Sequence, residues 1–358
     1  MGQKQSESLA NVVAKKTQKD KTEKPQINTQ STKLEKHIAM GDKIMKTSTP
    51  KKILIIAGGA NHERDVSLRT GSRVCNILKN LGHTVKTVDL NQETIKSIKE
   101  YNPDLIWPLL HGDLGEDGSL HNLLEILGYP YVGSSARACT VASSKPLAKT
   151  KIKQSGMTTP DFISLPQKIF KICGATQTLK LISEKLGYPL VIKPSIGGSA
   201  LGVSFATDEK TLREAMVDAF MYGQQVIIEK AVKGIELAIT VIEFDGQPKA
   251  MPIVEISPRE GDYDFDARYI VERTEYFTPA RITDQQAEKV KKYAEKVHKI
   301  LGLRDLSRID VIMDEKENIW FFDANVTPGM TDTSLLPQAA NAYSSFEEII
   351  EHIVQIKR

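Results

Sequence analysis

The sequence contains little cysteine and no long apolar run. Its 358 residues include three cysteines, Cys75, Cys139 and Cys173, which lie far apart and match no metal-ligand spacing. This pattern argues against a disulfide-stapled or zinc-bound scaffold and favours free thiols, so we expect a cytoplasmic protein. No apolar stretch approaches the roughly 18–20 residues that a membrane span needs. We therefore expect no membrane partner.

The first fifty residues lack both arginine and aromatic side chains. They hold ten lysines against five acidic residues and so carry a charge of +5, while the rest of the chain carries −2. Such a segment cannot bury enough apolar surface to offset its ordering entropy, and we predict a disordered basic extension over 1–48. The opening MGQKQS matches the short N-myristoylation pattern, but Met45 is a plausible alternative start and a solvated tail is the simpler interpretation. Because aromatics are not interleaved with the lysines, we expect no nucleic-acid partner.

From Lys51 onwards, short apolar runs alternate with helical patterns. KKILIIAGG, HTVKTVDL and PDLIWPLLHG read as strands, separated by helical stretches such as VSLRTGSRVCNILKNLG. This order predicts an α/β fold that begins with a parallel sheet. Later segments predict one helix over TVASSKPLAKTKIKQSG and two strands in QQVIIEKAVKGIELAITVIE. We place domains at 49–138, 139–232 and 233–358.

A glycine-rich loop follows the lysine-bearing strand in LVIKPSIGGSALGV. Lys193 precedes Gly197, Gly198 and Gly202. Glycines let backbone N–H groups approach an oxyanion closely, and a lysine adds a point charge for phosphate. The loop is not a Walker A loop, because the Gly-Lys-Ser/Thr order is absent. A plain hairpin remains the alternative for this stretch alone.

The segment QQVIIEKAVKGIELAI contains a strand whose end carries charged residues. Glu229, Lys230 and Val232 lie at the end of this strand, and Glu236 follows after a turn. An extended segment with free backbone groups and a carboxylate can hold an adenine edge and ribose hydroxyls. A solvated edge strand is the alternative.

Two further stretches place polar residues at alternate positions. SRIDVIMD carries Arg308 and Asp310, and FFDANVTPGMTDTSLLP carries Asp323 and Asn325. Residues two apart on a strand share a face. If the two strands pair antiparallel, Asp310, Asp323 and Asn325 converge on a site suited to Mg²⁺ beside a triphosphate. Arg308 beside them can stabilise charge that develops on a transferring group.

Two loops near the start also carry polar side chains after strands. Glu63 lies in GGANHERDVS, and His111 and Gly112 begin HGDLGEDG. Ligands bind at such strand ends in α/β folds. A set of such loops is more informative than either residue alone.

Six segments together resemble the D-alanine–D-alanine ligases of the ATP-grasp superfamily. They are GGANHERDVS, HGDLGEDG, VIKPSIGGSALG, DYDFDARY, RIDVIMD and DANVTPGMTDTSLLP, in the family's order and at its spacing over about 300 residues. The resemblance implies a three-domain ATP-grasp fold. It also implies ATP-dependent joining of two D-alanines through an acyl phosphate, in peptidoglycan precursor synthesis, by a homodimer.

The resemblance assigns a role to each matching residue. For the nucleotide it implies Lys145, Lys193, Glu229, Lys230, Val232, Glu236 and Arg268. For Mg²⁺, with Mn²⁺ as a substitute, it implies Asp310, Asp323 and Asn325. For the first D-alanine it implies Glu63 and His111, and for the second carboxylate Ser334 and Leu335. For catalysis it implies an oxyanion site of Arg308 and the Gly329 N–H, Ser334, and a hydrogen-bonded set of Glu63, Ser199 and Tyr269.

Four segments of the sequence differ from the family's usual residues. Asp323 replaces glutamate, Ser144 replaces aspartate, Arg268 replaces lysine, and Gly197-Gly198-Ser199-Ala200 replaces Glu-Gly-Ser-Ser. These changes leave alternatives open. One is an ATP-grasp ligase with another acceptor, such as D-lactate, D-serine or another amino acid. The other is a nucleotide-binding protein that has lost ligation.

Overall fold

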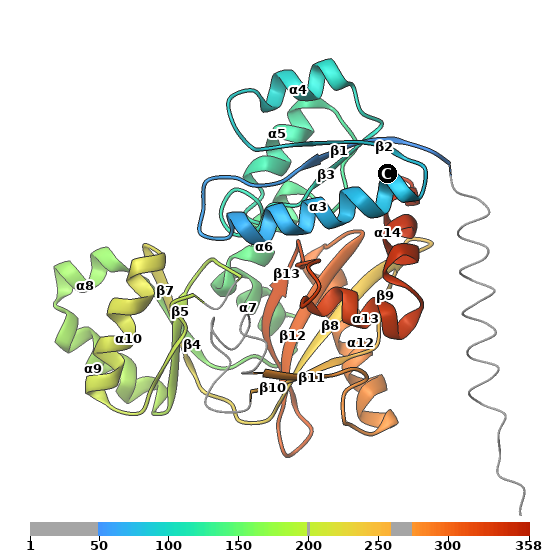
Figure 1. The fold of residues 1–358 in the computed structure, drawn as a ribbon. Coiled ribbons are helices and arrows are strands. Elements are labelled where there is room, and N and C mark those ends of the chain that lie inside the picture. The colour runs from blue at the N-terminus through green and yellow to red at the C-terminus, as the bar shows by residue number, and fades with distance from the viewer. Residues whose placement is uncertain (1–48, 199–200, 259–273) are drawn as a thin grey trace, which may run out of the picture. The chain divides into compact units, whose positions relative to one another are not determined.

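The computed structural model describes residues 49–198, 201–258 and 274–358 (Figure 1). All of these residues belong to the unit Lys43–Arg358. The basic extension predicted over 1–48 lies outside the described residues. Among the residues that are described, no helix is long and apolar enough to cross a bilayer.

The described residues begin with a parallel sheet, as the alternating pattern predicts. The strands β1 (Lys52–Ile56), β2 (Thr84–Val88) and β3 (Leu105–Pro108) pair in the order β2-β1-β3. The helices α3 (Arg64–Asn80), α4 (Thr94–Tyr101) and α5 (Ser119–Leu127) lie between and after them (Figure 1). The side chains of Ile53 to Ile56 are fully buried, which explains the unbroken apolar run of β1.

Helix α5 buries an imidazole that lacks a partner for one nitrogen. His121 is 2% exposed, its ring meets the Tyr131 ring edge-on, and no described residue bonds its Nδ1. Burial lowers the pKa of His121 from 6.5 to about 4, a shift that the nearby Glu125 and Asp117 carboxylates only partly oppose. Between these two values the unfolded chain binds more protons than the folded chain, so stability falls as the pH drops.

We expect His121→Phe to make the fold less sensitive to acid. The native imidazole should cost about 3 kcal/mol of unfolding free energy as the pH falls from 7 to 4. Urea unfolding at both pH values should therefore show a smaller loss for His121→Phe than for the wild type. His62→Gln, which changes an exposed imidazole, serves as the control. Equal losses in all three proteins would contradict the expectation.

The helix predicted over 140–156 is two helices, and the prediction of one is wrong. The chain forms α6 (Ala136–Ser143) and α7 (Lys145–Gln154), with Ser144 extended between them at ψ 99°. Pro146 occupies the first turn of α7, where it needs no N–H partner, but it cannot continue a preceding helix. The break starts a new helix at Lys145.

The next sheet is antiparallel and contains the predicted lysine-bearing strand. The strands β4 (Phe162–Pro166), β7 (Gln225–Lys230), β5 (Leu190–Pro194) and β6 (Ser204–Ala206) lie in the order β4-β7-β5-β6. One side packs against α8 (Gln167–Cys173), α9 (Ala175–Leu186) and α10 (Glu209–Tyr222), burying Phe170, Leu179 and Met216 against Ile192 and Ile228.

The last sheet is also antiparallel and is the largest. It runs β11 (Thr274–Phe277), β10 (Val254–Pro258), β8 (Ile235–Phe244), β12 (Leu306–Met313), β13 (Ile319–Asn325), with β9 (Gln247–Ala250) paired to β8. Helices α6, α7 and α12 (Asp284–Leu301) pack on one face, against Ile239, Val241, Ile309, Val311 and Phe321. The alternate residues therefore face the other way, and these include the predicted site residues. Helices α13 (Leu335–Tyr343) and α14 (Phe346–Gln355) complete the chain. The domain boundaries at 138/139 and 232/233 stay a prediction.

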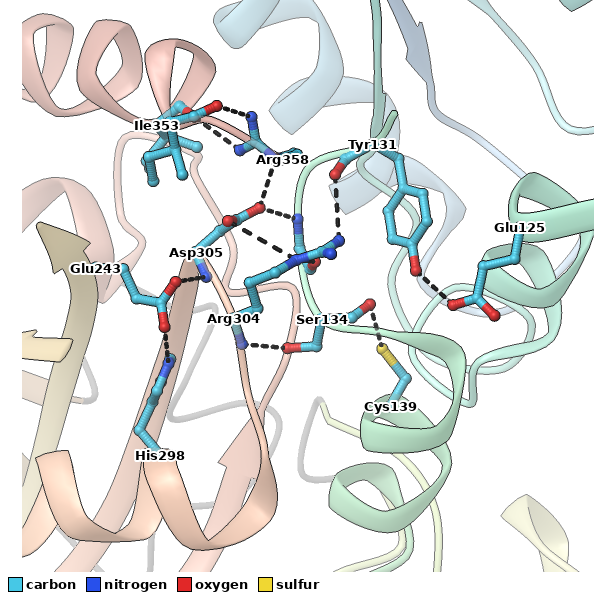
Figure 2. A network of polar contacts seen from close by, with 12 residues as sticks. Glu125, Tyr131, Ser134, Cys139, Glu243, His298, Arg304, Asp305, Ile353 and Arg358 are labelled. Carbon is cyan, nitrogen blue, oxygen red and sulfur yellow. Dashed lines mark hydrogen bonds and ion pairs between the residues drawn. The ribbon is translucent and has the colours of Figure 1, made fainter. Parts of the chain in front are cut away.

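A polar network joins the segment after β3 to the start of β12 and the chain end (Figure 2). The buried Asp305 carboxylate accepts from Gly133 N at 2.7 Å and from Arg358 Nε at 2.9 Å. Arg304 donates to Gly133 O at 2.8 Å, and its own N–H donates to Ser134 Oγ at 3.1 Å. These charged hydrogen bonds hold the segment that follows β3 against the residues that lead into β12.

Candidate active site

Two paired strands present four polar side chains on one face. β12 and β13 are antiparallel, with Arg308 opposite Asn325 and Asp310 opposite Asp323. The pairing predicted from the sequence is confirmed. Because directly opposite residues in an antiparallel pair point to the same side, the four side chains converge. The other face of both strands is packed in the core.

Arg308 and Asp310 form a two-point ion pair along β12. Arg308 Nε donates to Asp310 Oδ1 and Nη2 donates to Oδ2, both at 2.8 Å. The arginine is only 7% exposed, so its guanidinium plane is fixed by packing as well as by the carboxylate. A carboxylate has about four lone-pair sites, so Asp310 keeps capacity for a further ligand.

Asp323 is held by a lysine at the start of α7. Lys145, at the start of α7, donates from Nζ to Asp323 Oδ2 and to Gly197 O, both at 2.7 Å. Burial raises the pKa of Asp323, but the Lys145 and Lys193 ammonium groups outweigh burial and hold it below its usual range. The ionised carboxylate thus already has a cation beside it.

The residues on this face fit a divalent cation. Asp310, Asp323 and Asn325 supply hard oxygen atoms, which Mg²⁺ prefers. The Lys145 ammonium beside Asp323 shows that this position attracts positive charge. A bound cation would release Lys145 for another anion.

A second lysine pair surrounds a buried glutamate. Lys193 on β5 lies 2.5 Å from Glu229 Oε1, and Lys149 on α7 lies 2.8 Å from Oε2. Glu229 is fully buried and is not among the residues that line the cavity, and its predicted place at an adenine edge stays a prediction. Burial alone would raise the pKa of Glu229, but the two lysines hold it below its usual range.

A cavity of about 810 Å³ lies between the two antiparallel sheets and the first loops. Its lining contains Glu63, Lys145, Lys193, Val232, Glu236, Asp310 and Asp323 from the predicted set. Its size lies within the range of small-molecule sites. The side chains of His111, Glu229 and Arg308 are buried, whereas Lys230 is exposed. Ser199, Arg268 and Tyr269 lie outside the described residues.

The loop after β1 is fastened to the loop after β3. Asn61 Nδ2 donates to His111 O at 2.6 Å and to Asp113 O at 3.0 Å, while Asn61 Oδ1 accepts from Glu63 N at 3.0 Å. A Cβ at Gly112 would lie 2.2 Å from Glu63 Oε2, and φ there is +69°. Only glycine therefore lets the Glu63 carboxylate lie over this loop.

The Pro-Gly turn leads directly into a helix N-terminus. Ser334 immediately precedes α13 and makes no capping bond to it, and Leu335 is its first residue. Ser334 Oγ accepts from Thr331 N at 3.0 Å and would lie 2.9 Å from a Cβ on Gly329. The first N–H groups of a helix attract an anion, so this turn suits a carboxylate.

Helix α3, which follows β1, supports this turn through two hydrogen bonds to Met330. Arg73 Nη1 donates to Met330 O at 3.1 Å, and Thr70 Oγ1 accepts from Met330 N at 3.4 Å. The buried His111 reaches the same Thr70 hydroxyl at 3.4 Å. His111 thus contacts the support of the turn rather than the cavity.

We expect Arg73→Met to loosen the turn that carries the Gly329 N–H. The change leaves Met330 O without this donor, which costs about 1–3 kcal/mol for a buried group. Turnover should fall about three- to tenfold, because a small misplacement of a catalytic group lowers the rate. Steady-state kinetics can be compared with Arg69→Met, an exposed arginine on the same helix. Equal turnover in both variants would show that α3 does not position the turn.

Two antiparallel sheets enclose a cavity lined by lysines and carboxylates, as expected of an ATP-grasp fold. The family model described as "D-ala D-ala ligase C-terminus" matches residues 152–355. A D-alanine–D-alanine ligase of Pelotomaculum thermopropionicum is 35% identical over 306 residues, which are 85% of this chain and 96% of that protein. The chain belongs to the D-alanine–D-alanine ligase family.

Solved structures agree with this assignment. The D-alanine–D-alanine ligase of Bacillus anthracis has a TM-score of 0.73 at 30% identity, covering 85% of this chain and 96% of that one. The same enzyme complexed with ATP has a TM-score of 0.70 at 28% identity and the same coverage. The predicted ATP-grasp fold and the predicted family are confirmed.

The sequence interpretation missed several residues of this site. Lys149, Asn61 and Arg73 had no assigned role, although each holds a predicted residue or its neighbour. A signal was present for Lys149, since it lies one helical turn after Lys145 in SKPLAK. For Arg73 no sequence signal existed, because its partner lies 257 residues away.

Proposed function

We propose that this chain joins two D-alanines, with cleavage of ATP to ADP and phosphate, to give D-alanyl-D-alanine. Membership of the ligase family supports the activity. The observation that carries it is the single face that presents Arg308, Asp310 and Asp323, with Lys145 bonded to Asp323 and Lys193 lining the same cavity. This arrangement can hold a triphosphate and stabilise negative charge on a carbonyl oxygen.

The nucleotide would lie between the two antiparallel sheets. Lys145 and Lys193 would hold phosphates, and both line the cavity. The segment at Lys230 and Val232 would take the adenine through its backbone, and Glu236 would take the ribose hydroxyls. Glu229 would act on the site through Lys193. Arg268, outside the described residues, would add a further cation.

Mg²⁺, or Mn²⁺ in its place, would be held by Asp310, Asp323 and Asn325. When bound, the ion would supply charge neutralisation for the phosphate oxygens. Its presence would free Lys145 from Asp323, so that the lysine could contact phosphate.

The first chemical step would take place on the carboxylate of one D-alanine. A carboxylate oxygen attacks the γ-phosphorus, the bond to the β–γ bridging oxygen breaks, and ADP leaves. The product is an acyl phosphate. Glu63 would hold the ammonium group of this D-alanine, with His111 supporting the neighbouring loop from behind.

The second step would form the peptide bond. The amine of the second D-alanine, having lost a proton, attacks the acyl carbon, and phosphate leaves with the oxygen it received. Arg308 and the Gly329 N–H would stabilise the oxyanion, while Ser334 and the Leu335 N–H would hold the second carboxylate. Ser199 and Tyr269 would join Glu63 to orient the amine.

The setting follows from the proposed chemistry. The dipeptide would feed peptidoglycan precursor synthesis, which takes place in the bacterial cytoplasm. A homodimer and three domains at 49–138, 139–232 and 233–358 complete the proposal, with 1–48 as a basic extension outside the catalytic unit.

Product identification tests this function. The protein would be incubated with ATP, Mg²⁺ and a panel of D- and L-amino acids with D-lactate, and products would be analysed by mass. We expect D-alanyl-D-alanine as the main product. A depsipeptide or a D-serine product would instead identify another acceptor. Nucleotide binding without any product would indicate a protein that has lost ligation.

A further inference from the structure

Three buried charged side chains form a cluster that reaches the cavity through Lys193. Glu229 is fully buried and shared by Lys193 and Lys149, at 2.5 Å and 2.8 Å. Lys149 is also fully buried, whereas Lys193 is 7% exposed and lines the cavity. The two lysines therefore have different access to a ligand although they share one carboxylate.

Lys149 is fixed in place by its other contacts. Its Nζ donates to Thr159 Oγ1 at 3.0 Å and to Phe321 O at 3.2 Å, besides its bond to Glu229. The Phe322 ring lies 4.9 Å from Lys149 Nζ and 5.3 Å from Lys193 Nζ, and it also lines the cavity. Lys149 cannot leave this position without losing all of these contacts.

Binding of phosphate by Lys193 would reduce the positive charge that neutralises Glu229. Any movement of the Lys193 ammonium towards a phosphate weakens its bond to Glu229. A buried carboxylate that loses its counter-charge is strongly destabilising. Lys149 remains beside Glu229 throughout, so one positive charge always compensates the carboxylate.

We propose that Lys149 is a positioning residue for nucleotide binding: it neutralises Glu229 so that Lys193 can exchange that carboxylate for a phosphate. The inference rests on the proposed function, because it takes Lys193 as a phosphate ligand. Lys149 itself touches no substrate. Burial lowers the pKa of Lys149 to about 8, while Glu229 and, to a smaller extent, Asp323 favour its charged form.

The inference makes a specific prediction for paired substitutions. Lys149→Gln keeps an amide donor for Thr159 and Phe321 but removes the charge, so Lys193 alone must neutralise Glu229. The Kd for ATP with Mg²⁺ should rise at least tenfold. Lys149→Met should show the same rise. Adding Glu229→Gln to either variant removes the carboxylate that retains Lys193, and should restore Kd to within about threefold of the wild type.

Calorimetric titration of the full chain with Mg²⁺-ATP measures this directly. Thermal melting confirms that each variant is folded. If Lys149→Met does not fold, the test uses Lys149→Gln. Lys153→Gln, one turn further along α7 and paired with the exposed Asp161, is the control and should bind as the wild type does. KM for ATP should follow Kd, with a smaller change in kcat.

Two results would overturn the inference. One is an unchanged Kd for Lys149→Gln. The other is a double variant that binds as weakly as the single one, because that outcome would assign Lys149 a packing role. A wild-type protein that does not bind ATP at all would instead contradict the proposed function, and the two failures are therefore distinguishable.

Discussion

Replacing Arg308 by methionine is expected to lower kcat for ligation by about 10²–10³-fold, the scale of one lost oxyanion donor. The guanidinium is 7% exposed and held at two points by Asp310, so it is already oriented before substrate binds. Preorganised charge of this kind acts mainly on the transition state, where negative charge develops on the acyl oxygen. The loss should therefore appear in kcat rather than in KM for D-alanine.

Arg308→Lys separates charge from geometry in the same experiment. Lysine keeps the positive charge but cannot donate to both Asp310 oxygens in one plane. We expect its kcat to lie between those of the wild type and Arg308→Met. A kcat within about threefold of the wild type for Arg308→Met would remove Arg308 from the oxyanion site.

Replacing Asp323 by asparagine is expected to lower Mg²⁺-dependent turnover by about 100-fold, because it removes both a proposed metal ligand and the partner of Lys145. The amide cannot supply the negative charge that offsets Mg²⁺. Lys145 Nζ would also lose its ionic partner at 2.7 Å, while its bond to Gly197 O would remain. The concentration of Mg²⁺ at half-maximal activity should rise.

Asp323→Glu is the matched substitution, because it keeps the charge and lengthens the side chain to the form usual in the family. Activity should be retained or rise. Titrations of turnover with Mg²⁺ for both variants check the pair of expectations. A collapse of Asp323→Glu would show that the site is built around the shorter carboxylate, and full activity of Asp323→Asn would exclude Asp323 as a ligand.

Local periodicity predicted much of this site. Arg308 with Asp310, and Asp323 with Asn325, are spaced by two, and this spacing alone placed each pair on one strand face. The antiparallel pairing that joins the two pairs is also confirmed. The apolar residues between them pack in the core, so a shift of one residue would have turned the charges inward.

Long-range contacts were not predictable in this way. The Glu229 side chain points into the interior because Lys149 and Lys193 meet it there, and neither contact is visible in the pattern around Glu229. The break at Ser144 was predictable from Pro146, because a proline inside a helix clashes with the carbonyl group of the preceding turn. The other residues that the sequence did not indicate lie on one element and support a loop of another. Arg73 on α3, which donates to Met330 O, is an example.

Oxygen transfer from D-alanine to phosphate tests the acyl-phosphate mechanism most directly. D-Alanine labelled with ¹⁸O in both carboxylate positions would be incubated with unlabelled ATP, Mg²⁺ and the enzyme, and phosphate would be analysed by mass. The mechanism predicts one ¹⁸O atom in each phosphate released, with one ¹⁸O left in the new peptide carbonyl. Unlabelled phosphate, or ¹⁸O found in AMP, would contradict it.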